Sequence, residues 1–261
     1  MKLGLVKFLN ARPLDHGFRL MSGSDTVLKL TEDTPAELFR LLQLGELDAA
    51  LISSVEVLRN KDSLAYCKTV GVCADSEVRS ILYIKPRSSN SSIESQLLSA
   101  PLKIYADNGS RTSISLLKIL LYKSLGIRID IIATPPKEIP SLLLQDADSA
   151  GLLIGDSALE FQEVEQSKNF YCKDLGIWWN ELTGLPFVFA LWAYPKQKLI
   201  SDRFFEDSLQ SGLDHLDEII SESIYEGTDD YLRNVLHYRL NDRDHEALKL
   251  FNSELAKMDL L

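Results

Sequence analysis

The sequence predicts an α/β protein, in which parallel sheets carry helices on both faces. Strand-like and helix-like segments alternate from the first residues onward. Of the 261 residues, 45% are hydrophobic and 25% are charged, which excludes a disordered, collagen-like or coiled-coil chain. The length suits one large domain or two small ones, and either can bury a core.

The strand predictions follow short apolar runs that are bounded by turn residues or charges. Most are followed by a helical pattern, which is typical of β-α-β units. These runs cover residues 3–9, 27–30, 47–52, 80–84, 102–105, 129–132, 150–154 and 187–194.

The clearest helix signal is a capping box formed by Thr34 and Glu37, with Pro35 at the first helical position. Gly45 can end this helix in the left-handed conformation, and Gly126 can end a later helix with apolar residues at helical spacing. The other predicted helices cover residues 55–58, 114–125, 139–144, the stretch after residue 157, and the charged region from residue 196 to the end.

Ligands in such sheets bind beyond the carboxyl ends of the strands. This rule selects the turns that follow the predicted strands, and it places the ligand site along one rim. The selected turns are residues 10–16, 53–54, 75–80, 107–113 and 155–157. The segments 86–95 and 184–190 are the expected crossings between two lobes.

Charge and cysteine content narrow the class of protein. A net charge of −10 argues against a nucleic-acid partner, which needs a basic face. Three scattered cysteines favour free thiols in a reducing compartment. The apolar run at residues 3–9 is too short for a secretory signal, and no uncharged run approaches the ~18–20 residues of a membrane span. We therefore expect a cytoplasmic protein without a membrane segment.

Familiar catalytic motifs are missing from the sequence: there is no dinucleotide fingerprint, phosphate loop, zinc-protease helix or nucleophile elbow. His215, His237 and His245 lie in the charged C-terminal region and are predicted to be solvated. His16 follows the first strand, either as a turn residue or as a ligand contact.

The selected turns share hydroxyl groups at predicted helix N-termini. The free N–H groups and the positive end of the helix dipole favour an anion there. Each hydroxyl has an alternative role as the N-cap of its own helix. Together with Asn10 and Ser80 on the same rim, they predict a site for a small carboxylate. The turns are Ser53-Ser54 and Ser110-Arg111-Thr112-Ser113.

Two further groups have both a structural and a binding interpretation. Asp156 is an N-cap candidate, and it can also hydrogen-bond a ligand hydroxyl. The aromatic residues near the end of the predicted sheet either pack in the core or form the wall of a pocket for a cyclic ligand. They are Trp178, Trp179, Phe187, Phe189 and Trp192.

Four segments with distinctive sequences occur in a fixed order: FLNARPL at 8–14, GELDAALISSVE at 45–56, LIGDSAL at 153–159 and WNELTGLPFVFALW at 179–192. In these segments the chain resembles the chorismate dehydratases of the futalosine route to menaquinone. The resemblance covers residues 3–194 and continues loosely in the C-terminal helices. It implies a two-lobed fold like that of type II periplasmic binding proteins, with a ligand cleft between the lobes. Lobe one would comprise residues 1–85 plus 190–261, and lobe two residues 86–189.

The resemblance implies a carbon–oxygen lyase that removes water from chorismate to give 3-[(1-carboxyvinyl)oxy]benzoate. This reaction needs neither a metal nor a cofactor, so none is expected. Asn10 and Ser80 match the positions that line the reacting centre in this family, so they are the expected catalytic residues. Neither is a base at neutral pH, and the enolpyruvyl carboxylate of chorismate is therefore a candidate for that role.

The expected substrate-binding residues hold the two carboxylates of chorismate. They are Arg12, Ser53, Ser54, Ser110, Arg111, Thr112, Ser113 and Asp156. Arg79 is a further possible counter-charge. The turn that carries Arg111 matches no firm family pattern.

Three other functions remain open. A sister enzyme that forms 1,4-dihydroxy-6-naphthoate shares the fold, but it carries a catalytic histidine where this chain has Gly155 and Asp156. A non-catalytic binding protein for a small carboxylate is the second, and its usual place outside the cytoplasm counts against it. The effector domain of a DNA-binding regulator is the third, and it would need a helix-turn-helix before Met1.

Overall fold

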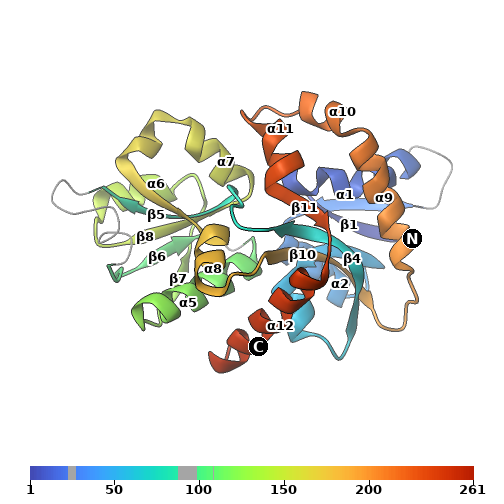
Figure 1. Cartoon of the computed structure of the whole chain (residues 1–261), viewed down its shortest axis with the longest axis horizontal. Coiled ribbons are helices and arrows are strands. Elements are labelled where there is room, and N and C mark those ends of the chain that lie inside the picture. Colours follow the sequence, from blue (N-terminus) through green and yellow to red (C-terminus); the bar gives the residue numbers. More distant parts are fainter. Residues whose placement is uncertain (23–27, 88–98, 108) are drawn as a thin grey trace.

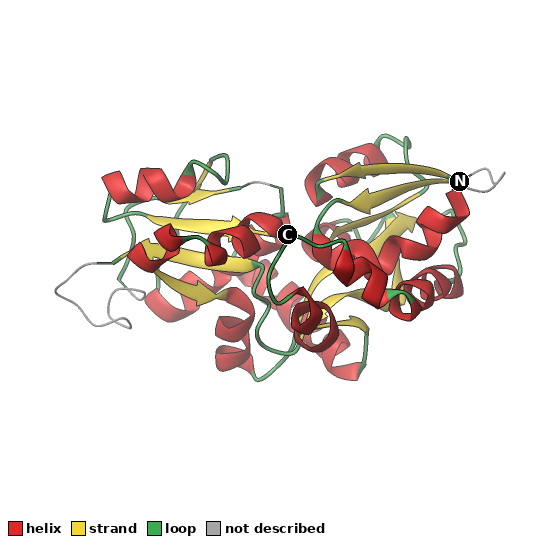
Figure 2. Ribbon diagram, turned by 90° about the horizontal axis from the view of Figure 1, so that it is seen from above, coloured by secondary structure: helices red, strands yellow, loops and turns green. Residues whose placement is uncertain are grey.

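The computed structural model describes residues 1–22, 28–87, 99–107 and 109–261. Two lobes lie side by side, each built on its own sheet (Figure 1). Figure 2 shows from above that helices cover both sides of the strands in each lobe. The α/β class and the two-lobed architecture predicted from the sequence are confirmed.

The sheet of lobe one has the strand order β11-β4-β10-β3-β1-β2. β1 is parallel to β2 and β3, whereas β10 is antiparallel to both β3 and β4. Its strands are β1 (Lys2–Val6), β2 (Lys29–Asp33), β3 (Ala49–Ser53), β4 (Leu64–Ala74), β10 (Phe187–Pro195) and β11 (Leu236–Arg239).

The sheet of lobe two has the order β7-β6-β8-β5-β9. β6 is parallel to β7 and β8, whereas β5 is antiparallel to β8 and β9. Its strands are β5 (Ile81–Pro86), β6 (Ile104–Ala106), β7 (Ile131–Ala133), β8 (Ala150–Ile154) and β9 (Phe170–Asp174).

Both sheets are therefore mixed, and the prediction of parallel sheets holds only for part of each sheet. The strand that enters each sheet from the other lobe runs antiparallel to its neighbours: β10 in lobe one and β5 in lobe two. At the edge of lobe one, β11 is also antiparallel to β4. A strand that arrives across the cleft runs against its neighbours, and an apolar run in the sequence does not reveal its direction.

The sheet pairings also place the crossings. β5 already belongs to lobe two, so the chain leaves lobe one between β4 and residue 81, before the expected limit at residue 85. The expected crossing at 86–95 lies largely outside the described residues, as does residue 27 of the second predicted strand. The return crossing falls between Thr183 and Phe187, because Phe187 and Val188 already pair with β4 in lobe one.

The helices lie between the strands in the chain. Those of lobe one are α1 (Arg12–Ser22), α2 (Pro35–Gln43), α3 (Ser54–Arg59), α9 (Asp202–Asp214), α10 (Leu216–Ser221), α11 (Thr228–Asp230) and α12 (Asp242–Lys257), with the short turns η1 (Leu9–Ala11) and η3 (Tyr231–Val235). Those of lobe two are α5 (Arg111–Leu125), α6 (Ile139–Gln145), α7 (Asp156–Glu163) and α8 (Leu175–Thr183), with η2 (Glu165–Asn169). No helix in the described part of the chain is long and apolar enough to cross a membrane.

Local signals had mixed outcomes. Thr34 accepts a hydrogen bond from the backbone of Glu37, whereas the Glu37 carboxylate pairs with Arg40, so the predicted capping box is half formed. Gly45 and Gly126 both adopt the left-handed conformation at helix ends, as predicted. The region after residue 196 is not wholly helical, because β11 interrupts it with alternating buried and exposed residues. β4 and β9 were not predicted.

Candidate functional site

A cavity with about 420 Å³ of space, including its opening to solvent, lies between the two lobes. Both lobes contribute walls, and no charged side chain is among the described residues that line it. The lining residues are Val6, Phe8, Asn10, Pro35, Leu51, Ser53, Val72, Ser80, Ile81, Ser110, Ser113, Ile154, Gly155, Phe189 and Ala190.

Several helices begin at this cavity. Pro35 opens α2, and Ser53, Ser110 and Gly155 are the N-caps of α3, α5 and α7. The Ser53 and Ser110 side chains make no capping hydrogen bond to their own helices. Because helix N-termini carry free N–H groups and partial positive charge, the cavity favours an anion without any cationic side chain.

The two predicted catalytic residues both line the cavity, from opposite lobes. Asn10 lies half-buried in η1, directly after β1. Ser80 precedes β5 and is 1% exposed, and its hydroxyl has no hydrogen-bond partner among the described residues. A buried hydroxyl without a partner loses the hydrogen bonds of water, so it favours a ligand that can pair with it.

The turn that carries Ser80 is held in an unusual conformation. Arg79 has a φ of 56°, in the left-handed region that non-glycine residues rarely adopt. The Asp174 carboxylate fixes this turn, because it accepts hydrogen bonds from the backbone N–H groups of Val78 and Arg79. The same carboxylate caps α8. Burial raises the pKa of Asp174, although its N–H partners favour the ionised form.

Asp156 acts across the cleft and is not the N-cap of its helix. Its Oδ1 accepts a hydrogen bond of 2.9 Å from the backbone N–H of Leu9, which ties α7 of lobe two to the turn that carries Asn10. The N-cap is Gly155, whose φ of 65° suits glycine and whose Cβ would lie 2.9 Å from the Phe8 ring if it had one. Burial raises the pKa of Asp156, while Leu9 and Lys7 oppose the shift.

The remaining predicted hydroxyls divide into two groups. Ser53, Ser110 and Ser113 line the cavity, where Ser53 has no described partner and the other two hydroxyls lie 3.0 Å apart. Ser54 and Thr112 bind each other and the backbone instead. The Ser54 hydroxyl donates to the Val188 carbonyl at 2.7 Å, and the Thr112 hydroxyl accepts from the Val55 N–H at 3.1 Å. Their hydrogen bonds connect lobe one to lobe two. The sequence had predicted that these two residues bind the substrate instead.

The three arginines considered as counter-charges are all paired with carboxylates. Arg12 lies 2.9 Å from Glu222 in an exposed pair, and Arg111 lies 3.2 Å from Glu56. Arg79 contacts both Glu77 and Asp230. Backbone N–H groups, hydroxyls and the Asn10 amide are therefore the donors that face the cavity.

His215 and His237 make side-chain contacts and differ from the prediction of solvated side chains, and His16 is neither the turn residue nor the ligand contact that was expected. His16 belongs to α1, where its ring stacks on His215 and its Nδ1 lies 3.0 Å from the Ser211 hydroxyl. His237 is half-buried and pairs with Asp244 at 3.0 Å. Helix packing in lobe one accounts for all of these contacts, and none of them reaches the cavity.

The aromatic residues are mostly core residues. Trp178, Trp179, Phe187 and Trp192 are at most 3% exposed. Phe189 lines the cavity, as does Phe8, so two rings border the space for a ligand.

One group of metal-ligand type occurs among the described residues. Potential ligand atoms of Cys73, His237 and Asp244 lie within 4.8 Å of one another, behind the sheet of lobe one. The Asp244 carboxylate already accepts from His237 and completes the capping box of α12 with Asn241. This cluster is explained by structural pairing.

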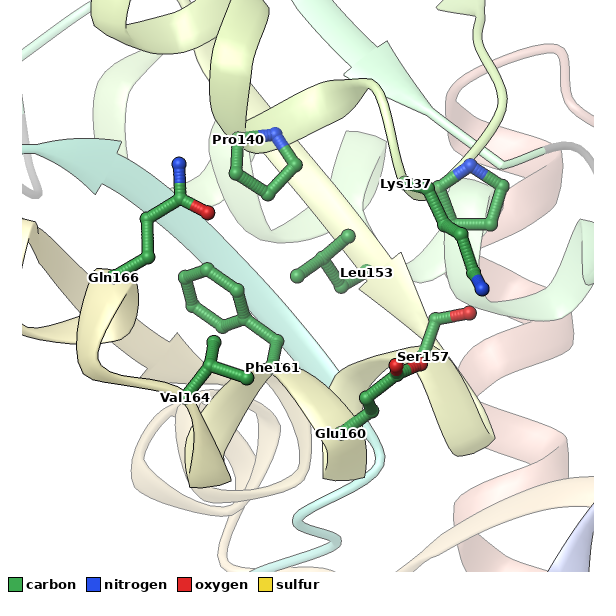
Figure 3. A pocket seen from close by; sticks show the side chains of 9 residues that line it. Lys137, Pro140, Leu153, Ser157, Glu160, Phe161, Val164 and Gln166 are labelled. Atoms are coloured by element: carbon green, nitrogen blue, oxygen red, sulfur yellow. The ribbon is translucent and has the colours of Figure 1, made fainter.

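A second hollow of about 520 Å³ lies on lobe two, away from the cleft (Figure 3). Leu153 and Phe161 form its apolar floor, with Lys137, Ser157 and Glu160 gathered at one end. It contains neither of the predicted catalytic residues, and we therefore place the functional site in the cleft.

Tyr231 is a buried polar residue that the sequence analysis did not consider. Its side chain is buried in η3 and lines a hollow with Arg79 and Tyr225, outside the residues that line the cleft cavity. The C-terminal region has no local motif around it, so only the fold brings this residue to the hollow.

The fold and the cleft define a two-lobed protein of the periplasmic-binding-protein-like class, with a site suited to a small anion. The match to known families is more specific. Residues 1–257 match the menaquinone biosynthesis family, and the chain belongs to that family.

Two curated relatives are similar over nearly their whole length. The chorismate dehydratase of Thermus thermophilus is 30% identical and covers 97% of this chain and 94% of its own. The chorismate dehydratase of Campylobacter jejuni is 26% identical, with 100% of both chains covered.

Solved structures support the fold alone. A protein from Archaeoglobus fulgidus has a TM-score of 0.74 at 17% identity, covering 100% of this chain and 98% of that chain. The aliphatic sulphonate binding protein of Escherichia coli has a TM-score of 0.64 at 12% identity, covering 100% of this chain and 88% of that chain.

Proposed function

We propose that this protein is a chorismate dehydratase, a hydro-lyase that converts chorismate to 3-[(1-carboxyvinyl)oxy]benzoate in the futalosine route to menaquinone. The observation that carries this proposal is the composition of the cleft. Asn10 and the unpartnered Ser80 hydroxyl face a cavity that has several helix N-termini and no charged lining residue among those described. The family match and the two dehydratase relatives support the same substrate.

Chorismate is a dianion, and the cleft supplies uncharged donors for it. The N-termini of α5 and α7 lie in lobe two, and those of α2 and α3 lie in lobe one. Two carboxylates held at these ends would draw the lobes together around the ring. Phe8 and Phe189 would then border the ring.

The chemistry is an elimination that makes the ring aromatic. The ring C–H beside the enolpyruvyl ether is acidified through the ring double bond by the ring carboxylate. Its electron pair forms the new ring double bond while the neighbouring C–OH bond breaks, and the hydroxyl leaves as water after it gains a proton. Oxidation state is unchanged overall, so the chemistry requires no redox cofactor.

Asn10 and Ser80 would act as hydrogen-bond donors to the leaving hydroxyl and to the ether side chain. The Asn10 amide has no basic lone pair at neutral pH, and Ser80 has no basic neighbour in the cavity lining. We infer that the enolpyruvyl carboxylate of the substrate accepts the ring proton. The contribution of the protein is orientation and stabilisation of developing charge.

The direct test is to incubate the purified, metal-free protein with chorismate and to follow the products by liquid chromatography with mass detection. We expect a product that is lighter by one water and has an aromatic ultraviolet spectrum. Unchanged chorismate that raises the melting temperature would instead indicate a binding protein, like the aliphatic sulphonate binding protein that shares the fold. If chorismate neither reacts nor binds, the proposed substrate is wrong.

A further inference from the structure

Asp156 makes a hydrogen bond between the lobes that the mechanism above does not use. Its Oδ1 lies 2.9 Å from the backbone N of Leu9 in lobe one. Figure 1 shows α7, which Asp156 begins, on the side of lobe two that faces lobe one. The side chain is partly buried, yet Asp156 is not among the described residues that line the cleft cavity. The carboxylate therefore contacts the backbone of the opposite lobe, outside the substrate contact that was expected of it.

The Leu9 N–H needs an acceptor from outside its own helical turn. Leu9 begins η1, and the first N–H groups of a helix have no acceptor within that helix. Phe8 stands at the N-cap, and its side chain has no atom that can accept a hydrogen bond. Asp156 supplies the acceptor from the other lobe. The position of η1, which includes Asn10, therefore depends on α7.

The same helix is fixed to the turn that carries Ser80. The backbone N–H of Gly155, the N-cap of α7, donates to the Ser80 carbonyl at 2.7 Å. Near the other end of α7, the Gln162 side-chain amide donates to the Arg79 carbonyl at 3.0 Å. These two contacts hold α7 and the Ser80 turn in one relative position.

One helix is thus bonded to the backbone beside both expected catalytic residues. Asn10 follows Leu9, and Ser80 accepts from Gly155. Asn10 and Ser80 line the cavity from opposite lobes, so their spacing depends on contacts that cross the cleft. We propose that Asp156 is a positioning residue, which sets Asn10 opposite Ser80 by holding the start of η1. This inference rests on the proposed dehydratase function.

The expected effect is on turnover more than on binding. Asn10 and Ser80 would donate to the same substrate, and a misplacement of about 1 Å can cost about 100-fold in rate. The helix N-termini that would hold the carboxylates stay on their own lobes when the Asp156 bond is lost. The substrate can then still bind, while its leaving hydroxyl is poorly aligned.

Three variants test this role: Asp156→Ala, Asp156→Asn and, as the matched control, Asp202→Ala. Asp202 begins α9 as Asp156 begins α7, and its Oδ2 accepts the backbone N–H of Lys68 at 3.0 Å. Both carboxylates thus make the same kind of bond, but Asp202 makes it within lobe one. Chorismate turnover, KM and melting temperature are measured for the wild type and each variant.

If Asp156 positions Asn10, Asp156→Ala lowers kcat about 100-fold and changes KM by less than about threefold. Asp156→Asn keeps an oxygen that can accept from Leu9, so its kcat stays within about fivefold of the wild type. Asp202→Ala lowers the melting temperature, as Asp156→Ala does, and keeps the wild-type kcat.

Four results would overturn the inference. A near-wild-type kcat in Asp156→Ala excludes the role, and a rise in KM alone would mean that Asp156 holds the substrate. An equal fall in kcat for Asp156→Ala and Asp156→Asn would mean that the charge itself acts in the reaction. An equal fall in Asp202→Ala would indicate a general loss of stability. Failure of the proposed function is distinguishable from all four, because the wild-type protein would then leave chorismate unchanged in the same assay.

Discussion

Two groups of buried hydroxyls at the lobe interface differ in their hydrogen bonding. Ser53 and Ser80 line the cavity, and their buried hydroxyls have no described partner. Ser54 and Thr112 lie nearby at the starts of α3 and α5, yet their hydroxyls bind each other and the backbone between the lobes. The difference teaches that similar buried hydroxyls can be satisfied by the fold or left available for a ligand, depending on contacts between distant parts of the chain.

This comparison assigns each cluster a different energetic role. Removing a hydroxyl that already has partners leaves those partners unpaired and lowers stability. Removing an unpartnered hydroxyl relieves a desolvation cost in the free protein. The change then weakens only the binding of the ligand or of the transition state. Stability and function should therefore separate between the two clusters.

The largest effect is expected for Asn10→Asp, in the cavity. A carboxylate in place of the amide removes the N–H donor and adds negative charge beside a dianionic substrate. We expect kcat to fall by about 10³-fold or more, with a smaller loss of chorismate affinity. Turnover assays and calorimetric titration measure the two quantities. Near-full turnover would remove Asn10 from the reacting centre.

The next largest effect is expected for Thr112→Val, which should lower the stability of the protein and leave its activity nearly unchanged. Valine has nearly the same shape, so the change leaves the Val55 N–H without its acceptor and removes the contact with Ser54. We expect a loss of about 1–3 kcal/mol, which for a protein of this size lowers the melting temperature by several degrees. The kcat of the folded protein should change little. A large fall in kcat at unchanged stability would contradict the division between the clusters.

Ser53→Ala is the matched change in the cavity. The serine hydroxyl has no partner to lose among the described residues, so the melting temperature should stay the same or rise. We expect chorismate to bind about tenfold more weakly, as is typical when one hydrogen bond to a charged group is removed. Thermal melting and titration on the same sample check both expectations. A drop in melting temperature with unchanged affinity would place Ser53 with the structural cluster.

The sequence predicted the class of fold and much of the rim, because strand runs, caps and glycine stops are local features. It placed Asn10, Ser53, Ser80, Ser110 and Ser113 on the rim, and all five line the cavity. It did not separate them from Ser54 and Thr112, since hydrogen-bond satisfaction depends on contacts between residues that are distant in the chain. The sequence did not predict the lobe to which β5 belongs or the position of Tyr231, for the same reason.

The smallest effect concerns a third polar cluster, the partnered pair of His237 and Asp244 behind the sheet of lobe one. Burial alone would lower the pKa of His237, but the hydrogen bond and charge of Asp244 outweigh it, so the pKa lies above its ordinary value. A raised pKa means that the charged form is favoured by folding. This stabilisation is complete below pH ~6.5 and is lost as the pH rises through the folded pKa.

His237→Gln removes this pH-dependent contribution. The difference in melting temperature between the wild type and the variant should therefore narrow by about 2 °C between pH 6 and pH 9, while kcat stays near the wild-type value. His245→Gln, one residue beyond Asp244 on α12, is the control and should show no such narrowing. If the difference in melting temperature between the wild type and His237→Gln instead grows with pH, the folded protein favours the neutral histidine. A fall in kcat would link this partnered cluster to the site, against the rule that separates the other two.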